Sequence, residues 1–128
     1  MRLLLDTRIL LWAAGAPDRL SEKAIALLTD VSNELLFSAA SMWEIVIKSG
    51  LGRDDFQVDA RQLRTALLVN GYHELPVSSL HALTLADLPT LHKDPFDRML
   101  LAQAIRDELT LVTADSLLTA YPGPIIKV

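Results

Sequence analysis

Five acidic residues of this chain stand where carboxylates can do chemistry: Asp6, Glu44, Asp94, Asp97 and Asp115. Two carboxylates about 5 Å apart repel each other by roughly 3 kcal/mol at an effective dielectric near 20. A fold tolerates several of them together if a cation, or a basic group from a partner, lies among them. Carboxylate oxygens suit Mg²⁺ and Mn²⁺, and one or two such ions can activate water for phosphodiester hydrolysis.

Helix capping is the competing explanation for each acid alone. Asp94 is followed by Pro95, which is the typical pairing of an N-cap with proline at the first helical position. Asp97 then occupies the third helical position, where a carboxylate favours the positive end of the helix dipole. Asp6 and Asp115 could each cap a helix after a strand. Because Ser, Thr or Asn can cap equally well without mutual repulsion, five acids together favour a role beyond capping.

The elements that must position these acids alternate along the chain. Strand-length apolar runs cover residues 3–5, 34–37, 74–77, 109–113 and 125–128. Stretches of helical character cover 21–28, 39–48, 60–70, 79–86 and 95–107. This alternation predicts an α/β fold, a three-layer α/β/α sandwich with a mainly parallel central sheet. In such sheets ligands bind at the carboxyl ends of the strands, where Asp6 and Asp115 are expected.

Composition limits the class of protein. The chain has 128 residues, 51% of them apolar, which predicts a single globular domain over residues 1–128. No apolar run is long enough to span a membrane and no secretory signal is visible. With no cysteine, a cytoplasmic location is expected. The net charge of −4 argues against binding nucleic acid by overall charge.

Any phosphate contact must therefore come from local cations. Arg8 lies two residues after the first acid. The other available cations are Lys48, Arg53, Lys93, Arg61 and Arg64, of which the last two are expected to be merely solvated at the surface. Residues 49–59, with two glycines and three aspartates, are expected to form a surface loop between helices.

Four motifs in order now make the chain recognisable: "LLLDTRILLW", "SAASMWEIVIKSGLG", "LPTLHKDPFDRMLLAQA" and "LTLVTADSLLTAY". Together they resemble the PIN-domain family, and within it the VapC-type toxin ribonucleases of bacterial toxin–antitoxin pairs. The resemblance covers essentially the whole chain. It implies a PIN-like fold, a Mg²⁺- or Mn²⁺-dependent endoribonuclease with one or two ions, an RNA substrate, a homodimer, and a small VapB-like antitoxin as partner.

The family's metal-binding acids carry over to Asp6, Glu44, Asp97 and Asp115. Asp94, within "DPFDR", is assigned mainly to capping, with a supporting role near the metal. Three further residues are candidates for a supporting or substrate-binding role: Thr7, Arg8 and Thr113. Relatives with this opening often carry His where this chain has Arg8.

Other interpretations remain for the same residues. A phosphoaspartate receiver would need a phospho-accepting Asp after the third strand, where "ELPVSS" has none, and a haloacid-dehalogenase-type phosphatase would need a second acid in Asp6-Thr7-Arg8. The serious competitor is a catalytically inactive PIN scaffold whose acidic rim binds a basic protein partner. His81 and His92 are predicted to be structural, because neither has zinc-ligand spacing.

Overall fold

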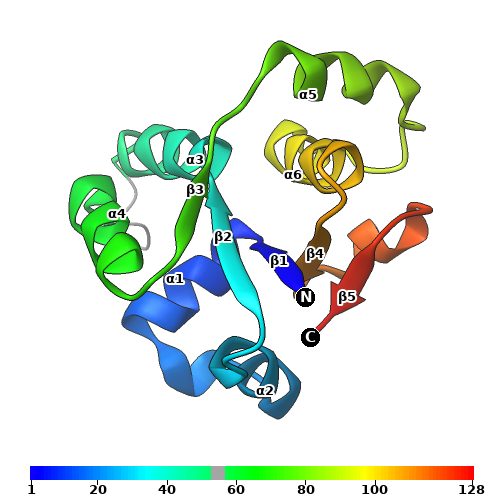
Figure 1. Cartoon of the computed structure of the whole chain (residues 1–128). Coiled ribbons are helices and arrows are strands. Elements are labelled where there is room, and N and C mark those ends of the chain that lie inside the picture. The colour runs from blue at the N-terminus through cyan, green and yellow to red at the C-terminus, as the bar shows by residue number, and fades with distance from the viewer. Residues whose placement is uncertain (53–56) are drawn as a thin grey trace.

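The computed structural model describes residues 1–52 and 57–128, which form a five-stranded, wholly parallel sheet covered by helices (Figure 1). The strands are β1 (Arg2–Leu5), β2 (Glu34–Ser38), β3 (His73–Leu75), β4 (Thr110–Thr113) and β5 (Ile125–Lys127). The α-helices are α1 (Thr7–Gly15), α2 (Glu22–Thr29), α3 (Ala39–Ser49), α4 (Ala60–Val69), α5 (Ser79–Thr84) and α6 (Pro95–Arg106). Short 3₁₀ turns are η1 (Pro17–Arg19), η2 (Leu85–Asp87) and η3 (Ser116–Ala120). The predicted fold class is confirmed.

The order of the strands brings two distant segments together at the centre of the sheet. The order is β3-β2-β1-β4-β5, so the chain builds one side of β1 first and then crosses to the other. In the register of β1 with β4, Leu5 pairs with Val112. The topological switch point, where open α/β sheets bind ligands, is therefore the boundary between the carboxyl ends of β1 and β4.

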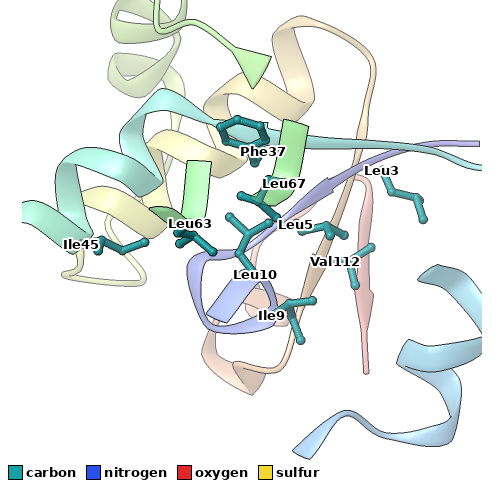
Figure 2. Packing of buried hydrophobic residues seen from close by; sticks show 9 residues of the cluster. All are labelled: Leu3, Leu5, Ile9, Leu10, Phe37, Ile45, Leu63, Leu67 and Val112. Carbon is teal, nitrogen blue, oxygen red and sulfur yellow. The ribbon is translucent and has the colours of Figure 1, made fainter. Parts of the chain in front are cut away.

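Alternating residues of the strands fill two hydrophobic cores. Leu3, Leu5 and Val112 belong to the core that Ile9 and Leu10 of α1 close, together with residues of α3 and α4 (Figure 2). The intervening positions face the other core, where they pack against α6. Its buried members are Leu4, Leu36, Leu100, Leu101, Ala104, Leu109, Leu111, Leu118 and Tyr121. Because adjacent strand residues point to opposite faces, burial on both faces explains why the strands read as continuous apolar runs.

Several helices begin at side-chain caps. Asp6 caps α1, Ser38 caps α3 and Asp94 caps α6, each by accepting a hydrogen bond from a backbone N–H of the first turn. The predicted start of a helix at residue 39 is thus confirmed by α3. These caps leave no loop between β1 and α1 or between β2 and α3, which fixes the side chains at both strand ends.

The structure departs from the predicted elements in three places. Helix α1 over Thr7–Gly15 was not among the predicted helical stretches. The predicted helix over 79–86 ends at Thr84 and continues as the 3₁₀ turn η2. The third strand lies at His73–Leu75 rather than 74–77, because Pro76 cannot donate to the ladder.

The predicted loop over 49–59 begins at the end of α3, but residues 53–56 lie outside the described part of the chain, and Arg53 with them. Among the described residues no helix combines the length and the apolar character that crossing a bilayer requires.

Candidate metal centre

Asp6 lies at the carboxyl end of the central strand and is almost fully buried. Its Oδ1 accepts the cap hydrogen bond from the backbone N–H of Ile9 at 2.9 Å. Its Oδ2 accepts from the Thr113 hydroxyl at 2.5 Å and from the N–H of Ala114 at 3.3 Å. Burial raises the pKa of Asp6, and the three donors oppose that rise. Asp6 is therefore both the N-cap of α1 and a member of the acidic cluster.

Glu44 is supplied by the second turn of α3 and is only 4% exposed. One carboxylate oxygen accepts from the Thr7 hydroxyl at 2.6 Å, and that hydroxyl also lies 2.9 Å from Ser41 Oγ. The other oxygen forms an ion pair with Lys48 on the next turn of the same helix. A buried carboxylate with one cation and one hydroxyl donor is held in a single position.

Asp94 and Asp97 lie at the start of α6 and have different contacts. Asp94 Oδ1 accepts from the N–H of Phe96 at 2.9 Å and from the N–H of Asp97 at 3.2 Å, which is an N-cap. The Asp97 side chain is 18% exposed, receives no such bond from the described residues, and lies close enough to the other acids to feel their charge. Burial, followed by the charges of Asp94, Asp6 and Glu44, raises the pKa of Asp97 to about 7, although His92 opposes the rise.

Asp115, in the segment after β4, is the last member of the acidic cluster. Its Oδ1 caps η3 through the N–H of Leu117 at 2.9 Å, and its Oδ2 lies 3.0 Å from His92 Nε2. Partial burial opposes ionisation of Asp115, but the bonds from His92 and Leu117 outweigh it and hold its pKa below the ordinary value. The capping and clustering explanations are thus both correct for this residue, because each uses a different oxygen.

These acids line one cleft of about 830 Å³ at the carboxyl ends of β1 and β4. The acidic members are Asp6, Glu44, Asp59, Asp94, Asp97 and Asp115. Three cations, Arg8, Arg19 and Lys48, line the same cleft. The cleft is therefore lined by both acidic and basic side chains.

The structure brings together every acid predicted from the sequence, and it shows the contacts of their neighbours. Thr113 donates to Asp6 and also accepts the N–H of Asp115 at 3.0 Å, so it both satisfies the turn and orients an acid. Thr7 supports Glu44. Arg8 is exposed and lines the cleft.

One member of the cluster was missed by the sequence analysis. His92, predicted to be merely structural, has its Nε2 3.0 Å from Asp115 Oδ2 and 3.3 Å from Asp97 Oδ2. Ligand atoms of His92, Asp97 and Asp115 all lie within 4.8 Å of one another. The available signal was its position two residues before Asp94; its approach to Asp115 depends on the fold.

The comparisons with known proteins identify the family and the fold. The model of the PIN domain family matches residues 3–123, and the chain belongs to that family. A comparison with curated protein sequences found no match.

Among solved structures, VapBC2 from Rickettsia felis bound to a promoter DNA fragment contains a chain that is 18% identical, with a TM-score of 0.71 over 99% of this chain and 98% of that one. FitAcB from Neisseria gonorrhoeae is 18% identical, with a TM-score of 0.67 over 98% and 96%. A toxin–antitoxin complex from Klebsiella pneumoniae is 19% identical, with a TM-score of 0.64 over 98% and 96%. These likenesses establish the fold.

Proposed function

We propose that this protein is a metal-dependent endoribonuclease that acts as the toxin of a toxin–antitoxin pair. Its family consists of nucleases, and the acidic cleft lies at the switch point of its sheet. The observation that carries the proposal is Asp97, a carboxylate without a capping role that faces three other acids inside the cleft. The absence of cysteine supports action in the cytoplasm.

The donor set fits a hard divalent cation. Burial, and after it the charges of the neighbouring acids, raise the pKa of Asp97 to about 7, and a bound cation would offset that rise. We assign Mg²⁺ or Mn²⁺, one or two ions, to Asp6, Glu44, Asp97 and Asp115, whose oxygens are the ligand type these metals take. When bound, the metal supplies activation of water and neutralisation of charge on the scissile phosphate.

The surrounding residues prepare the acids for this role. Thr113 holds Asp6, while Thr7 and Lys48 hold Glu44, so that little reorganisation is needed when a substrate arrives. Arg8 at the edge of the cleft is suited to contact an RNA phosphate. Because the whole chain is acidic, such local cations must provide the attraction for RNA.

A small antitoxin is the proposed protein partner. The similar solved structures are toxin–antitoxin complexes. In this chain an apolar pocket of about 530 Å³ between α1, α2 and α4 shares Ala14 and Ala66 with the acidic cleft. A partner segment with apolar side chains followed by a basic one would match this pair of neighbouring surfaces.

A homodimer is proposed from the exposed apolar face of α3. Trp43, Val46 and Ile47 lie at positions i, i+3 and i+4 of that helix and are 63%, 58% and 40% exposed. Contiguous exposed apolar side chains of this kind are a feature of protein–protein contact sites.

The test is cleavage of RNA by the purified chain with Mg²⁺ or Mn²⁺ and after chelation, beside Asp97→Asn. We expect cleavage that requires metal and is lost in the variant, which should remain folded. Binding of a basic antitoxin-like peptide without any cleavage of transfer, ribosomal or messenger RNA would instead favour the inactive scaffold.

A further inference from the structure

His92 lies inside the acidic centre and is held there from both sides. Its side chain is 11% exposed. The hydroxyl of Tyr121, a residue of the second core, accepts the backbone N–H groups of Leu91 at 3.2 Å and His92 at 2.8 Å. The backbone that carries the ring is thereby tied to the core. A histidine fixed in this way meets its partners in one orientation.

The hydrogen bonds of the ring determine which nitrogen carries the proton. The backbone N–H of Asp94 donates to His92 Nδ1 at 3.1 Å, so this nitrogen is an acceptor. In a neutral imidazole the proton must then be on Nε2. Nε2 is the nitrogen that lies 3.0 Å from Asp115 Oδ2 and 3.3 Å from Asp97 Oδ2. Although the three side chains are close enough to share a metal, a protonated nitrogen donates to carboxylates and does not bind a cation.

We propose that His92 is a positioning residue: its Nε2–H donates to Asp115 and lies 3.3 Å from Asp97 Oδ2, and so keeps the two acids next to each other as a pair of ligands without binding the metal itself. The inference rests on the proposed function, because it assumes that these two acids hold a cation. Asp115 accepts the hydrogen bond, and Asp97 lies close enough to the same N–H for an electrostatic attraction. Residues that orient metal ligands typically change metal affinity about 10- to 100-fold when they are replaced.

His81 provides an internal control with the same chemistry elsewhere. Its Nδ1 accepts the N–H of Ser78 at 3.0 Å, and its Nε2 lies 3.1 Å from Asp107 Oδ1. It has the same tautomer and the same kind of carboxylate partner, but it contacts none of the four proposed ligands. Any response to metal that is specific to the centre should therefore appear at His92 and be absent at His81.

Two measurements test the inference at a pH where the rings are neutral. In the ¹⁵N-histidine-labelled wild type, two-bond ¹H–¹⁵N spectra with and without Mg²⁺ should show that His92 Nε2 keeps its proton while its signals shift, and that those of His81 stay in place. By calorimetry with Mn²⁺, His92→Phe should bind about 10- to 100-fold more weakly than wild type. His92→Gln, which keeps an N–H donor, should recover part of that loss, and His81→Gln should bind as wild type does.

Loss of the Nε2 proton when metal is added would overturn the inference, because His92 would then be a ligand. Wild-type affinity in His92→Phe would overturn it as well and would leave the proposed function intact. If the wild type itself binds no divalent metal, both the proposed function and this inference are wrong. The spectra require no variant, so a folding defect of His92→Phe cannot remove the test.

Discussion

The hydroxyl of Thr113 donates to the carboxylate of Asp6 across 2.5 Å, although the two residues are 107 positions apart in the chain. Each stands at the carboxyl end of its strand, and both are almost completely buried. This bond joins β1 to β4 at the switch point of the sheet, where the acidic cleft opens. The same hydrogen bond therefore contributes to the stability of the fold and holds one acid of the candidate centre in place.

Thr113→Val should destabilise the metal-free protein, because it removes a donor from a buried carboxylate while preserving side-chain shape. Hydrogen bonds to charged groups contribute about 1.5–3 kcal/mol. The loss should be larger at pH 8 than at pH 5, since without this donor the pKa of Asp6 is raised further and its charged form becomes harder to bury. Urea denaturation at the two pH values measures it. Thr110→Val, on the same strand and without a side-chain hydrogen bond among the described residues, is the control.

Asp97→Asn should stabilise the metal-free protein at pH 8. The folded state keeps a proton on Asp97 up to its pKa of about 7, whereas the unfolded chain releases it near 3.8. The folded state thus binds more protons between these values, and wild-type stability falls as pH rises through that window. The variant should escape this loss, by about 2–4 kcal/mol at pH 8, and differ little near pH 4.

Thermal or urea unfolding from pH 4 to pH 8, with and without Mg²⁺, tests this prediction. Added Mg²⁺ should stabilise wild type at pH 8 and leave the variant nearly unchanged. Asp87→Asn, an exposed acid outside the cleft, should change stability by less than about 0.5 kcal/mol. A variant that is less stable than wild type at pH 8 would show that Asp97 is a structural acid.

Asp94 allows capping and charge to be separated. Asp94→Ala should cost about 1 kcal/mol, because the N–H groups of Phe96 and Asp97 lose their acceptor. Asp94→Asn keeps a capping oxygen and should stay near wild-type stability. Both variants remove a charge that raises the pKa of Asp97, so both should lower that pKa, which ¹³C-carboxyl NMR titration can follow. Equal destabilisation by Ala and Asn would contradict the capping assignment.

Arg8→Gln should weaken binding of single-stranded RNA and reduce its salt dependence. Loss of one phosphate contact lowers the slope of log K against log salt by about 0.7 for a single strand. Fluorescence anisotropy across a salt series, in an Asp97→Asn background to prevent cleavage, gives this slope. Arg106→Gln, at the opposite end of α6 from the acids, should leave the slope unchanged.

Val46→Glu should convert the proposed dimer into a monomer, because it places a charge on the exposed apolar face of α3 that also carries Trp43 and Ile47. Sedimentation velocity compares the oligomeric states. Val31→Glu, at a fully exposed position in the turn before β2, is the matched control and should sediment as wild type does. A wild-type protein that sediments as a monomer would rule out the dimer.

Much of the fold was predictable because buried strands and helices have recognisable patterns of apolar residues in the sequence. Strands buried on both faces read as apolar runs, and Asp94-Pro95 marks the start of α6 within one residue. Helix α1 was missed because it begins directly after the strand: in "LLLDTRILLW" Asp6 ends β1 and caps α1, and apolar residues continue on both sides of it. No turn residue separates the two elements.

The candidate centre was predictable only in part for a related reason. The acids could be located from strand ends and from the resemblance to the PIN domain family. The position of His92 could not, because it depends on a contact with Asp115, 23 residues further on, and on the anchoring hydroxyl of Tyr121. Such contacts arise from packing between elements, and local spacing carries no trace of them.

Because β1 lies between β2 and β4, the candidate centre is complete only when both halves of the chain pack on β1. An intermediate that contains only the first three strands holds Asp6 and Glu44, while Asp97 and Asp115 arrive with α6 and the end of β4. A chain in which α6 and β4 are not docked against β1 lacks two of the four proposed ligands. The proposed cleavage of RNA therefore requires the two halves of the sheet to be docked on each other.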